Sequence, residues 1–497
     1  MKNKTNQGSL TTLLVAFILV AGFAFSSTMD VDDRLDVVLD GNLVQTLNFN
    51  SGTLGRTMVA PSFEWPSGSG KEYAFEFGLI IGSRISRNDQ EPIYFFTDGL
   101  SVGGVNNGSE GNGENEWQPV AGYSAGDPNT SIARNDDTST WSELWTSWPS
   151  ISESISTAAA LETYYVMNDK HNARHEGEFT AITSDSTYLG AGIEVGVWTY
   201  QWDTADLEDA LLVAYVVKNI SDSAMDSVVA GMRGDLKIGG YMDYSDDNVG
   251  YINDEGFDVF SGLTYISMSN LIYCWDTDRV GDESFGTDSV GFFGIHLLQH
   301  NASDYFRSLR VPPYRNDSDA ESVWWSRFNT SVDTTSFVQD ADNMLEWGTD
   351  FFSLGVGESK IILVSYVFGN SFDELVENTQ AIDIKYEETF GTMVGIDLND
   401  EILVPSKIQI TNAYPNPFNS SISISYLLKE NALVSLSIYD ITGRLVKNLI
   451  HDEQSAGSNS IVWDGLGNVG QDLDSGMYFL NISSDGEDQS KKILLLK

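Results

Sequence analysis

The segment from Leu211 to Ile220 reads LLVAYVVKNI, a continuous apolar run of the length of one strand. Before it, Ile193 to Trp202 alternates apolar with polar or small residues. After it, Ser221-Asp222-Ser223 leads to the apolar segment from Val228 to Met232. Short apolar runs and period-two alternation, separated by turn residues, are typical of β-strands. We therefore predict that these segments form a hairpin or meander of the kind found in β-sandwiches.

Two further regions repeat this pattern. Tyr73 to Ile85 (YAFEFGLIIGSRI) alternates so that its large apolar side chains fall on one face of a strand. Residues 351–368 contain two apolar runs separated by a turn at 355–359, which predicts a second hairpin. Both regions favour an all-β architecture.

A single helix is predicted near the end of this β-rich body. Ser371 and Glu374 are spaced as a capping box, in which both side chains can satisfy backbone amides of the first turn. The sequence thus predicts a mainly β protein, with a large β-sandwich-type body at about 28–400 that forms either one unit or two subdomains. The apolar residues of the helix recur near the helical period: Phe372, Leu375, Val376, Ile382, Tyr386 and Phe390.

The body is strongly acidic. The net charge of the 497-residue chain is −45; two lysines in 1–27 and a net of −3 over 405–497 leave −44 for residues 28–404. A surface of this sign repels phosphate backbones, so nucleic acid is not expected as a partner. The charge has two explanations, which are solubility in salty water or a surface loaded with cations.

The N-terminus predicts export. Lys2 and Lys4 precede an apolar stretch from Leu13 to Phe25, and Ala24-Phe25-Ser26 is an A-x-S cleavage site, so residues 1–27 are expected to be a signal peptide. No later stretch approaches the roughly 20 apolar residues that a spanning helix needs, so we expect no transmembrane segment in the mature chain. Cys274 is the only cysteine and is expected to be a buried apolar residue.

A second β module is predicted after a linker at 397–405. Residues 421–426 (SISISY) and 434–438 alternate strictly, and Gly443 supplies the positive φ that a hairpin turn before 444–446 needs. Further strand-like segments extend to residue 496. About seven short strands over 405–497 are enough for a small Ig-like β-sandwich.

Five features of this module resemble the type A C-terminal sorting domain of the type IX secretion system, a relative of the Ig-like hook-capping domains. They are YPNPFN at 414–419, IYDITGRLV at 438–446, Trp463-Asp464-Gly465, Gly476-Met477-Tyr478 and a basic-then-apolar strand at 491–497. The resemblance implies export through the periplasm by a type IX-like machinery, then release or attachment at the outer cell surface. It assigns the sorting motif to Tyr414, Pro415, Asn416, Pro417, Phe418, Asn419, Gly443, Lys491 and Lys492.

Two acidic loops of the body are candidate cation sites. The loop that starts at Asp276 matches the first, third and sixth positions of a calcium loop, but Val280 breaks the fifth and Thr287 stands where a bidentate glutamate belongs. The other loop surrounds Gly239-Gly240. We expect calcium as the cation; the alternative is that these carboxylates are only solvated. The candidate ligands are Asp235, Asp243, Asp246, Asp247, Asp276 and Asp278.

Two catalytic motifs occur without the context that they require. Ser124 lies in a G-x-S-x-G sequence, but Asp127-Pro128 opposes the helix that a nucleophile elbow needs. His171 and His175 have the spacing to share a metal on a helix, yet Gly177 disfavours a helix there and the H-E-x-x-H order is absent. No catalytic residue is therefore assigned.

Clustered tryptophans fit two roles: they can stack on sugar rings, and more often they fill a core. We expect an exported structural or adhesive surface protein that binds glycans or cations and is not an enzyme. The alternative is a secreted glycan-active hydrolase, whose carboxylate pair cannot be located among 72 acidic residues. The tryptophans are Trp141, Trp145, Trp148, Trp324 and Trp325.

Overall fold

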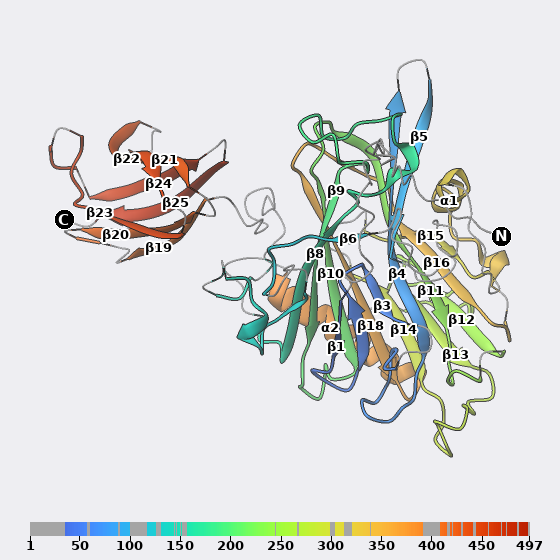
Figure 1. Cartoon of the computed structure of the whole chain (residues 1–497). Coiled ribbons are helices and arrows are strands. Elements are labelled where there is room, and N and C mark those ends of the chain that lie inside the picture. The colour runs from blue at the N-terminus through green and yellow to red at the C-terminus, as the bar shows by residue number, and fades with distance from the viewer. Residues whose placement is uncertain are drawn as a thin grey trace, which may run out of the picture.

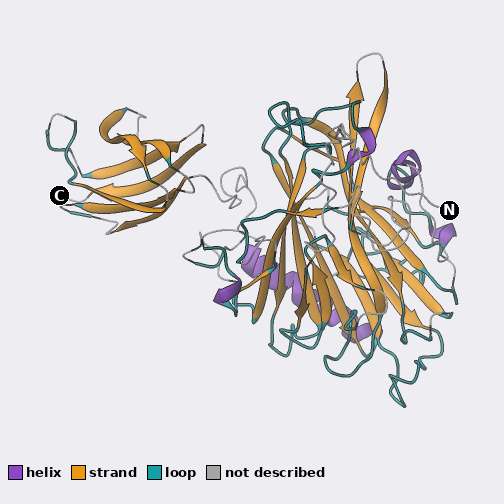
Figure 2. Cartoon of the chain, viewed as in Figure 1, coloured by secondary structure: helices purple, strands orange, loops and turns teal. Residues whose placement is uncertain are grey.

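Strands in antiparallel sheets far outnumber helices among the described residues, which confirms the predicted mainly β fold class (Figure 2). The predicted signal peptide and linker, as well as Pro415, Asn416, Pro417 and Gly443, lie outside the described residues. The computed structural model describes residues 35–495 except 57–59, 88–89, 100–116, 126–130, 144, 146, 150, 152–156, 244, 266–267, 299–303, 313–320, 338, 391–407, 415–417, 420, 429–430, 441–443, 456, 469, 474 and 485–486.

The described residues of the body form two nine-stranded sheets (Figure 1). The strands of the first are β1 (Asp36–Leu39), β2 (Thr46–Phe49), β3 (Thr53–Gly55), β4 (Ala74–Arg87), β5 (Gln90–Asp98), β11 (Met225–Leu236), β15 (Phe306–Arg310), β16 (Met344–Thr349) and β17 (Phe352–Leu354). They follow the order β1-β2-β3-β4-β11-β16-β15, with β5 paired to β4 and β17 to β11.

The second sheet has the order β12-β13-β14-β18-β10-β9-β8-β6, with β7 paired to β8. Its strands are β6 (Gln118–Pro119), β7 (Ala133–Arg134), β8 (Leu161–Asn168), β9 (Ile193–Gln201), β10 (Ala210–Asn219), β12 (Asp247–Ile252), β13 (Leu271–Asp276), β14 (Phe292–Leu297) and β18 (Ser359–Gly369).

One shared core joins the two sheets. Alternation along the strands directs Phe77 of β4 and Val213 of β10 into it. The ring of Phe63 lies 5.4 Å from that of Phe77 in the first sheet and 5.6 Å from that of Phe293 in the second. Burial of this apolar surface is the main force that holds the sheets face to face.

Two predicted hairpins are wrong in their strand pairing, because each turn crosses from one sheet to the other. β9 and β10 pair as predicted, but β10 and β11 lie in different sheets, and so do β17 and β18. Asn219 joins the two crossings, since its amide donates to the carbonyls of Leu354 and Gly355 (both 3.1 Å). An apolar run predicts a buried strand but does not specify which sheet the strand joins.

Helix α2 (Phe372–Phe390) confirms the predicted helix, and its buried face packs on the outer face of the second sheet. The N–H of Glu374 donates to the Ser371 hydroxyl (3.2 Å), as a capping box requires. The Glu374 carboxylate accepts from the N–H of Asn370 (3.1 Å), one residue before the serine. The side chains of Ser371 and Glu374 therefore each accept a hydrogen bond from a backbone N–H at the N-terminus of the helix.

Helix α1 (Glu321–Phe328) was not predicted and packs on the outer face of the first sheet. Gly231 and Gly348 leave the space for it, because a Cβ at either position would lie 2.7 or 2.5 Å from the ring of Phe328. Short 3₁₀ helices complete the body: η2 (Thr138–Thr140), η3 (Ala173–His175) and η4 (Thr334–Ser336). Within the described residues, the longest helix is too polar to cross a membrane.

The C-terminal module has seven strands in two sheets, with the orders β19-β20-β23 and β22-β21-β24-β25. The predicted hairpin before 446 is confirmed by the pairing of β21 with β22. Its apolar cluster contains only residues from 408 onward. The strands are β19 (Ile408–Tyr414), β20 (Ile422–Leu428), β21 (Ala432–Asp440), β22 (Leu445–Gln454), β23 (Gly457–Trp463), β24 (Gly476–Ser484) and β25 (Glu487–Leu495).

Candidate metal centre and C-terminal module

Three carboxylates from the two acidic loops meet at one place, which we call the candidate cation site: Asp243, Asp246 and Asp276. One oxygen of each lies within 4.8 Å of those of the others. Asp276 ends β13, whereas Asp243 and Asp246 lie between β11 and β12. Two oxygens on opposite sides of a calcium ion, each about 2.4 Å from it, are about 4.8 Å apart. The spacing therefore fits a single divalent ion.

Backbone hydrogen bonds fix the two loops against each other. The N–H of Thr277 donates to the carbonyl of Asp246 (3.2 Å), and the N–H of Asp282 donates to the carbonyl of Gly239 (2.8 Å). The Asp282 carboxylate in turn accepts from the N–H of Met242 (3.2 Å). The three carboxylates are thus held together by the backbone, without any contribution from a ligand.

Gly239 is required at the floor of the site. Its φ of +106° is a conformation that other residues rarely adopt. A Cβ there would lie 2.6 Å from Oδ2 of Asp243 and 3.0 Å from Oδ2 of Asp276. Only glycine allows both carboxylates to approach this close.

Two oxygens of the site receive no hydrogen bond from an N–H or hydroxyl group of the described residues, and the two carboxyls that carry them are close enough to share a proton. Asp276 is fully buried; its Oδ1 accepts from the N–H of Arg279 (2.5 Å), while its Oδ2 receives no such hydrogen bond among the described residues. The same holds for Oδ2 of Asp243 in the described part of the chain. A buried carboxylate oxygen that is left unpaired costs free energy, and a coordinated cation would remove that cost.

Electrostatics at the site disfavour three negative charges. Burial, together with the neighbouring Asp246 and Asp243, raises the pKa of Asp276 to about 7. Burial and then Asp246 raise the pKa of Asp243, and burial followed by Asp278 and Asp340 raises that of Asp246. No cationic side chain of the described residues lowers these three pKa values, and a divalent ion would supply the missing positive charge.

The guanidinium of Arg279, which follows the site in the sequence, does not supply this positive charge. Arg279 donates through its side chain to the carbonyl of Val290 and to the carbonyl of Asn370 (2.7 Å). Its guanidinium also lies over the ring of Phe292, 4.9 Å from the centroid. These contacts direct it away from the carboxylates.

The other three predicted ligands lie outside this three-carboxylate group. Asp235 on β11 is 3.9 Å from the Lys237 ammonium, and burial raises the pKa of its carboxyl to about 7. Asp247 is fully buried directly opposite Asp276, and burial raises its pKa well above the usual value. Asp278 accepts from the N–H of Val280 (2.8 Å). Asp278 thus shapes its own loop, in the manner of an Asx-turn.

The remaining sequence motifs lie apart from one another in the body. Nε2 of His175 lies 2.8 Å from Oε2 of Glu321, which ties η3 to α1. Ser124 lies in a bend after the two-residue strand β6, and its buried hydroxyl has no hydrogen-bond partner among the described residues. Cys274 is fully buried in β13, as predicted. None of these positions gathers the partners of a catalytic site among the described residues.

The tryptophans pack against protein. Trp148 lies 5.6 Å from Trp141 and 6.1 Å from Trp145 between ring centroids, and its indole N–H donates to Glu162 (2.6 Å). All three are half-buried. Trp324, a residue of α1, is buried between this helix and the first sheet.

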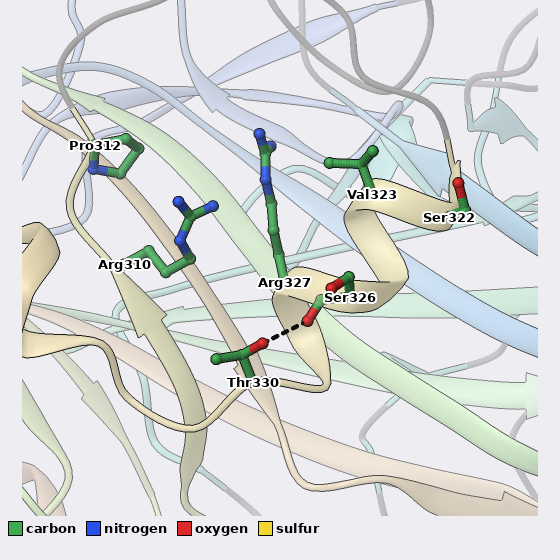
Figure 3. A pocket seen from close by; sticks show the side chains of 7 residues that line it. All are labelled: Arg310, Pro312, Ser322, Val323, Ser326, Arg327 and Thr330. Atoms are coloured by element: carbon green, nitrogen blue, oxygen red, sulfur yellow. Dashed lines mark hydrogen bonds between the residues drawn. The ribbon is translucent and has the colours of Figure 1, made fainter.

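A pocket of about 670 Å³ lies between β15 and α1 (Figure 3). Sequence reasoning missed it, although basic residues stand out in so acidic a chain. No carboxylate is among the described residues that line it, which are Arg310, Pro312, Ser322, Val323, Ser326, Arg327 and Thr330.

In the C-terminal module, the described part of the predicted sorting motif packs on the last strand. Phe418 is buried; its N–H donates to the carbonyl of Leu494 (2.9 Å), and its ring lies 5.3 Å from that of Trp463. Asn419 is exposed, and Lys491 is half-exposed on β25. Tyr414 ends β19 and Lys492 lies on β25. The opening motif and the terminal strand are therefore one structural unit.

Residues 412–496 match the family described as the secretion system C-terminal sorting domain. The match confirms the predicted type IX sorting domain, and it identifies the chain as a secreted or cell-surface protein that interacts with the type IX export machinery. No curated protein sequence matches the chain.

Solved structures give only distant likenesses. The match to a polysaccharide lyase covers 93% of this chain and 46% of the lyase, at 8% identity and a TM-score of 0.25. The match to FlgD from P. aeruginosa covers 18% of this chain and 68% of FlgD, at 22% identity and a TM-score of 0.14. The match to a putative aldose 1-epimerase from Escherichia coli K12 covers 68% of this chain and 99% of the epimerase, at 10% identity and a TM-score of 0.29. This chain thus spans less than half of the lyase, and no argument rests on these likenesses.

Proposed function

We propose that the protein is a surface binding protein, structural or adhesive in role, whose acidic body is stabilised by one calcium ion at the candidate cation site. The observation that supports this most is the fully buried Asp276, whose Oδ2 receives no hydrogen bond from an N–H or hydroxyl group of the described residues and faces the carboxylates of Asp243 and Asp246. Hard carboxylate oxygens at this spacing suit calcium. Backbone carbonyls and water would complete its coordination.

The position of the site explains how one ion would stabilise the body. The site joins the loop between β11 and β12 to the loop after β13, and β11 and β13 belong to different sheets. An ion that binds only the folded arrangement shifts the folding equilibrium toward that arrangement. In a body without a disulfide, such a link would add to core burial.

The alternative, a glycan-active hydrolase, requires two carboxylates that converge in a cleft. The pocket between β15 and α1 is lined by arginines and hydroxyls instead, and the tryptophans pack on protein. These features favour a binding role over hydrolysis.

The proposal is tested by thermal unfolding of the mature chain in millimolar calcium and in sodium chloride of equal ionic strength. At 100 times its dissociation constant, one bound ion adds about 2.7 kcal/mol to the stability of the folded state. In a domain of this size that raises the melting temperature by roughly 2–4 °C. Sodium reproduces screening but not coordination. Identical melting curves in the two salts would overturn the proposal.

A further inference from the structure

We propose that His296 of β14 and Asp383 of α2 form a pH-sensitive latch, which holds helix α2 on the second sheet while the His296 ring is charged and loosens when the ring loses its proton. Nε2 of His296 lies 2.8 Å from Oδ1 of Asp383. Neither residue belongs to the candidate cation site, so this inference is independent of the calcium proposal.

Both nitrogens of the His296 ring face oxygen acceptors. Nε2 faces the Asp383 carboxylate, and Nδ1 lies 3.2 Å from the backbone carbonyl of Asn270. A carbonyl and an ionised carboxylate can only accept, so both contacts are hydrogen bonds only when both ring nitrogens carry a proton. That form is the positively charged imidazolium. The geometry around the ring therefore favours its charged form.

A neutral ring would lose one of the two contacts. It carries a single N–H, so either Nδ1 would present its lone pair to the carbonyl of Asn270 or Nε2 would present its lone pair to Asp383. The His296 side chain is buried, with 3% of its surface exposed. A buried acceptor that faces another acceptor costs free energy, so deprotonation weakens the contact between β14 and α2.

Backbone hydrogen bonds hold the carbonyl of Asn270 against the ring. This carbonyl also accepts from the N–H of Leu297, the residue after His296 (3.1 Å), and the N–H of Asn270 donates to the carbonyl of Asn253 (3.1 Å). Asn270 has a φ of +51°, a conformation that asparagine adopts more readily than most residues. The acceptor for Nδ1 is thus part of the backbone fold.

Asp383 brings the charge that faces the ring from α2. The residues directly opposite His296 on the neighbouring strands, Leu271 of β13 and Ser365 of β18, are uncharged. Burial lowers the pKa of His296, but Asp383 and the neighbouring backbone outweigh burial, so the pKa is raised above its usual 6.5. The stability that the latch contributes is therefore complete below pH 6.5 and is lost as pH rises through the higher pKa of the folded state.

Two further titratable groups lie close to this contact among the described residues. Asp304, whose backbone carbonyl lies 3.5 Å from the side-chain nitrogen of Asn270, pairs with Lys360 of β18. Tyr386 follows Asp383 by about one helical turn, and burial raises the pKa of its hydroxyl above the usual 10. Tyr386 therefore stays neutral in the range in which His296 titrates.

The latch lies within the interface that holds α2. Ile382 and Tyr386, on either side of Asp383 in the helix, are buried in the apolar cluster of the outer face. Helix α2 is the last described element before the C-terminal module. Because the charged contact adds to this packing only while His296 is protonated, we expect α2 to open more readily in alkaline solution.

The first test follows α2 by hydrogen exchange with mass-spectrometric detection. The mature full-length chain is measured between pH 5.5 and pH 9, with rates corrected for the intrinsic effect of pH. We expect the protection of α2 to fall as pH rises, by about tenfold for each unit by which the pKa of His296 exceeds its usual value.

The second test observes the ring directly. In protein labelled with 15N-histidine, the chemical shifts of both ring nitrogens of His296 should be those of an imidazolium at pH 6. The signals are assigned by their loss in His296→Gln, which should also make the protection of α2 independent of pH in this range.

One variant and one matched control separate the latch from the general field of the protein. Asp383→Asn keeps an acceptor for Nε2 but removes the negative charge, so it should move the pH midpoint of α2 protection and of the His296 titration to lower pH. The Asp383 side chain is 40% exposed, so this variant is expected to fold. Asp373→Asn, at an exposed position of the same helix, should leave both midpoints unchanged.

Three results would overturn the inference. They are a neutral His296 ring at pH 6, equal protection of α2 at pH 6 and pH 9 in the natural protein, and equal midpoint shifts in Asp383→Asn and Asp373→Asn. The last would show that the overall negative charge of the protein, not this contact, sets the pH dependence.

Discussion

Oδ2 of Asp243 and Oδ2 of Asp276 lie 2.6 and 3.0 Å from the position that a Cβ on residue 239 would occupy, so the glycine there leaves the space for both carboxylates. The two loops are joined by backbone hydrogen bonds, so this approach is part of the fold itself. Burial is the largest cause that raises the pKa of both carboxyls; Asp243 raises that of Asp276 further, whereas a hydrogen bond with Asp276 lowers that of Asp243. This arrangement supports the proposal that the body binds calcium.

The first prediction concerns Gly239. Gly239→Ala should abolish the calcium-dependent rise in melting temperature, because the methyl group occupies the space between the carboxylates. It should also destabilise the protein by about 1 kcal/mol or more through the positive φ alone. Gly262→Ala is the matched control, since its φ is +73° and nothing lies within 4 Å of an added Cβ. If both variants keep the full calcium response, the carboxylates near Gly239 are not its source.

The second prediction concerns Glu162 on β8. Burial raises the pKa of its carboxyl to about 7, although the hydrogen bond from Trp148 opposes the shift. The folded protein then holds this proton more tightly than the unfolded chain, whose glutamates titrate near 4.5. Stability from this group is complete below pH 4.5 and is lost as pH rises toward 7.

Glu162→Gln removes that loss, because an amide cannot ionise and still accepts from Trp148. Relative to the natural protein, the variant should gain up to about 3 kcal/mol in the free energy of unfolding between pH 4 and pH 8. Thermal and urea unfolding at the two pH values measure it. Glu143→Gln, at an exposed position, is the control. Parallel pH profiles for all three proteins would contradict the prediction.

The third prediction concerns the last strand of the sorting domain. Ile493 is fully buried in the apolar cluster of the module, and its neighbour Leu494 accepts the N–H of Phe418. Ile493→Asp should unfold the module, because a buried unpaired carboxylate costs several kcal/mol. The fraction of protein at the cell surface or in the medium should then fall, with accumulation in the periplasm.

Surface labelling and cell fractionation measure this effect. Phe479→Asp, on the adjacent strand and 39% exposed, introduces the same charge without removing a core residue. Natural levels of Ile493→Asp on the surface would show that the folded module is not needed for export.

Much of the fold could be predicted because its signals are local. The run at 211–220 is β10, the alternating segment at 73–85 lies in β4, and the capping box at Ser371 starts α2. Strand partners could not be predicted, since Asn219 and Gly355 mark turns without saying that the chain changes sheet. Helix α1 was missed because only Trp324 and Phe328 of its eight residues are buried, which gives a weak periodic pattern.

The sequence predicted that carboxylates of these loops form the candidate site, but not which of them come together. The loop at Asp276 resembled a calcium loop that supplies its own ligands, yet the structure combines Asp276 with Asp243 and Asp246 from another loop. The signal for this was Gly239-Gly240, whose positive φ values permit the close approach. Contacts between loops depend on sheet topology, which a single sequence does not specify.

Direct calcium binding tests the central claim most closely. Titration calorimetry of the mature chain with calcium, at constant ionic strength and pH 7.5, should give a saturable isotherm with one ion per chain, and magnesium should bind more weakly. Asp276→Asn and Asp243→Asn should each remove this binding, while Asp278→Asn, outside the three-carboxylate group, should keep it. An absence of saturable heat with the natural protein, or an unchanged isotherm in Asp276→Asn and Asp243→Asn, would contradict the account.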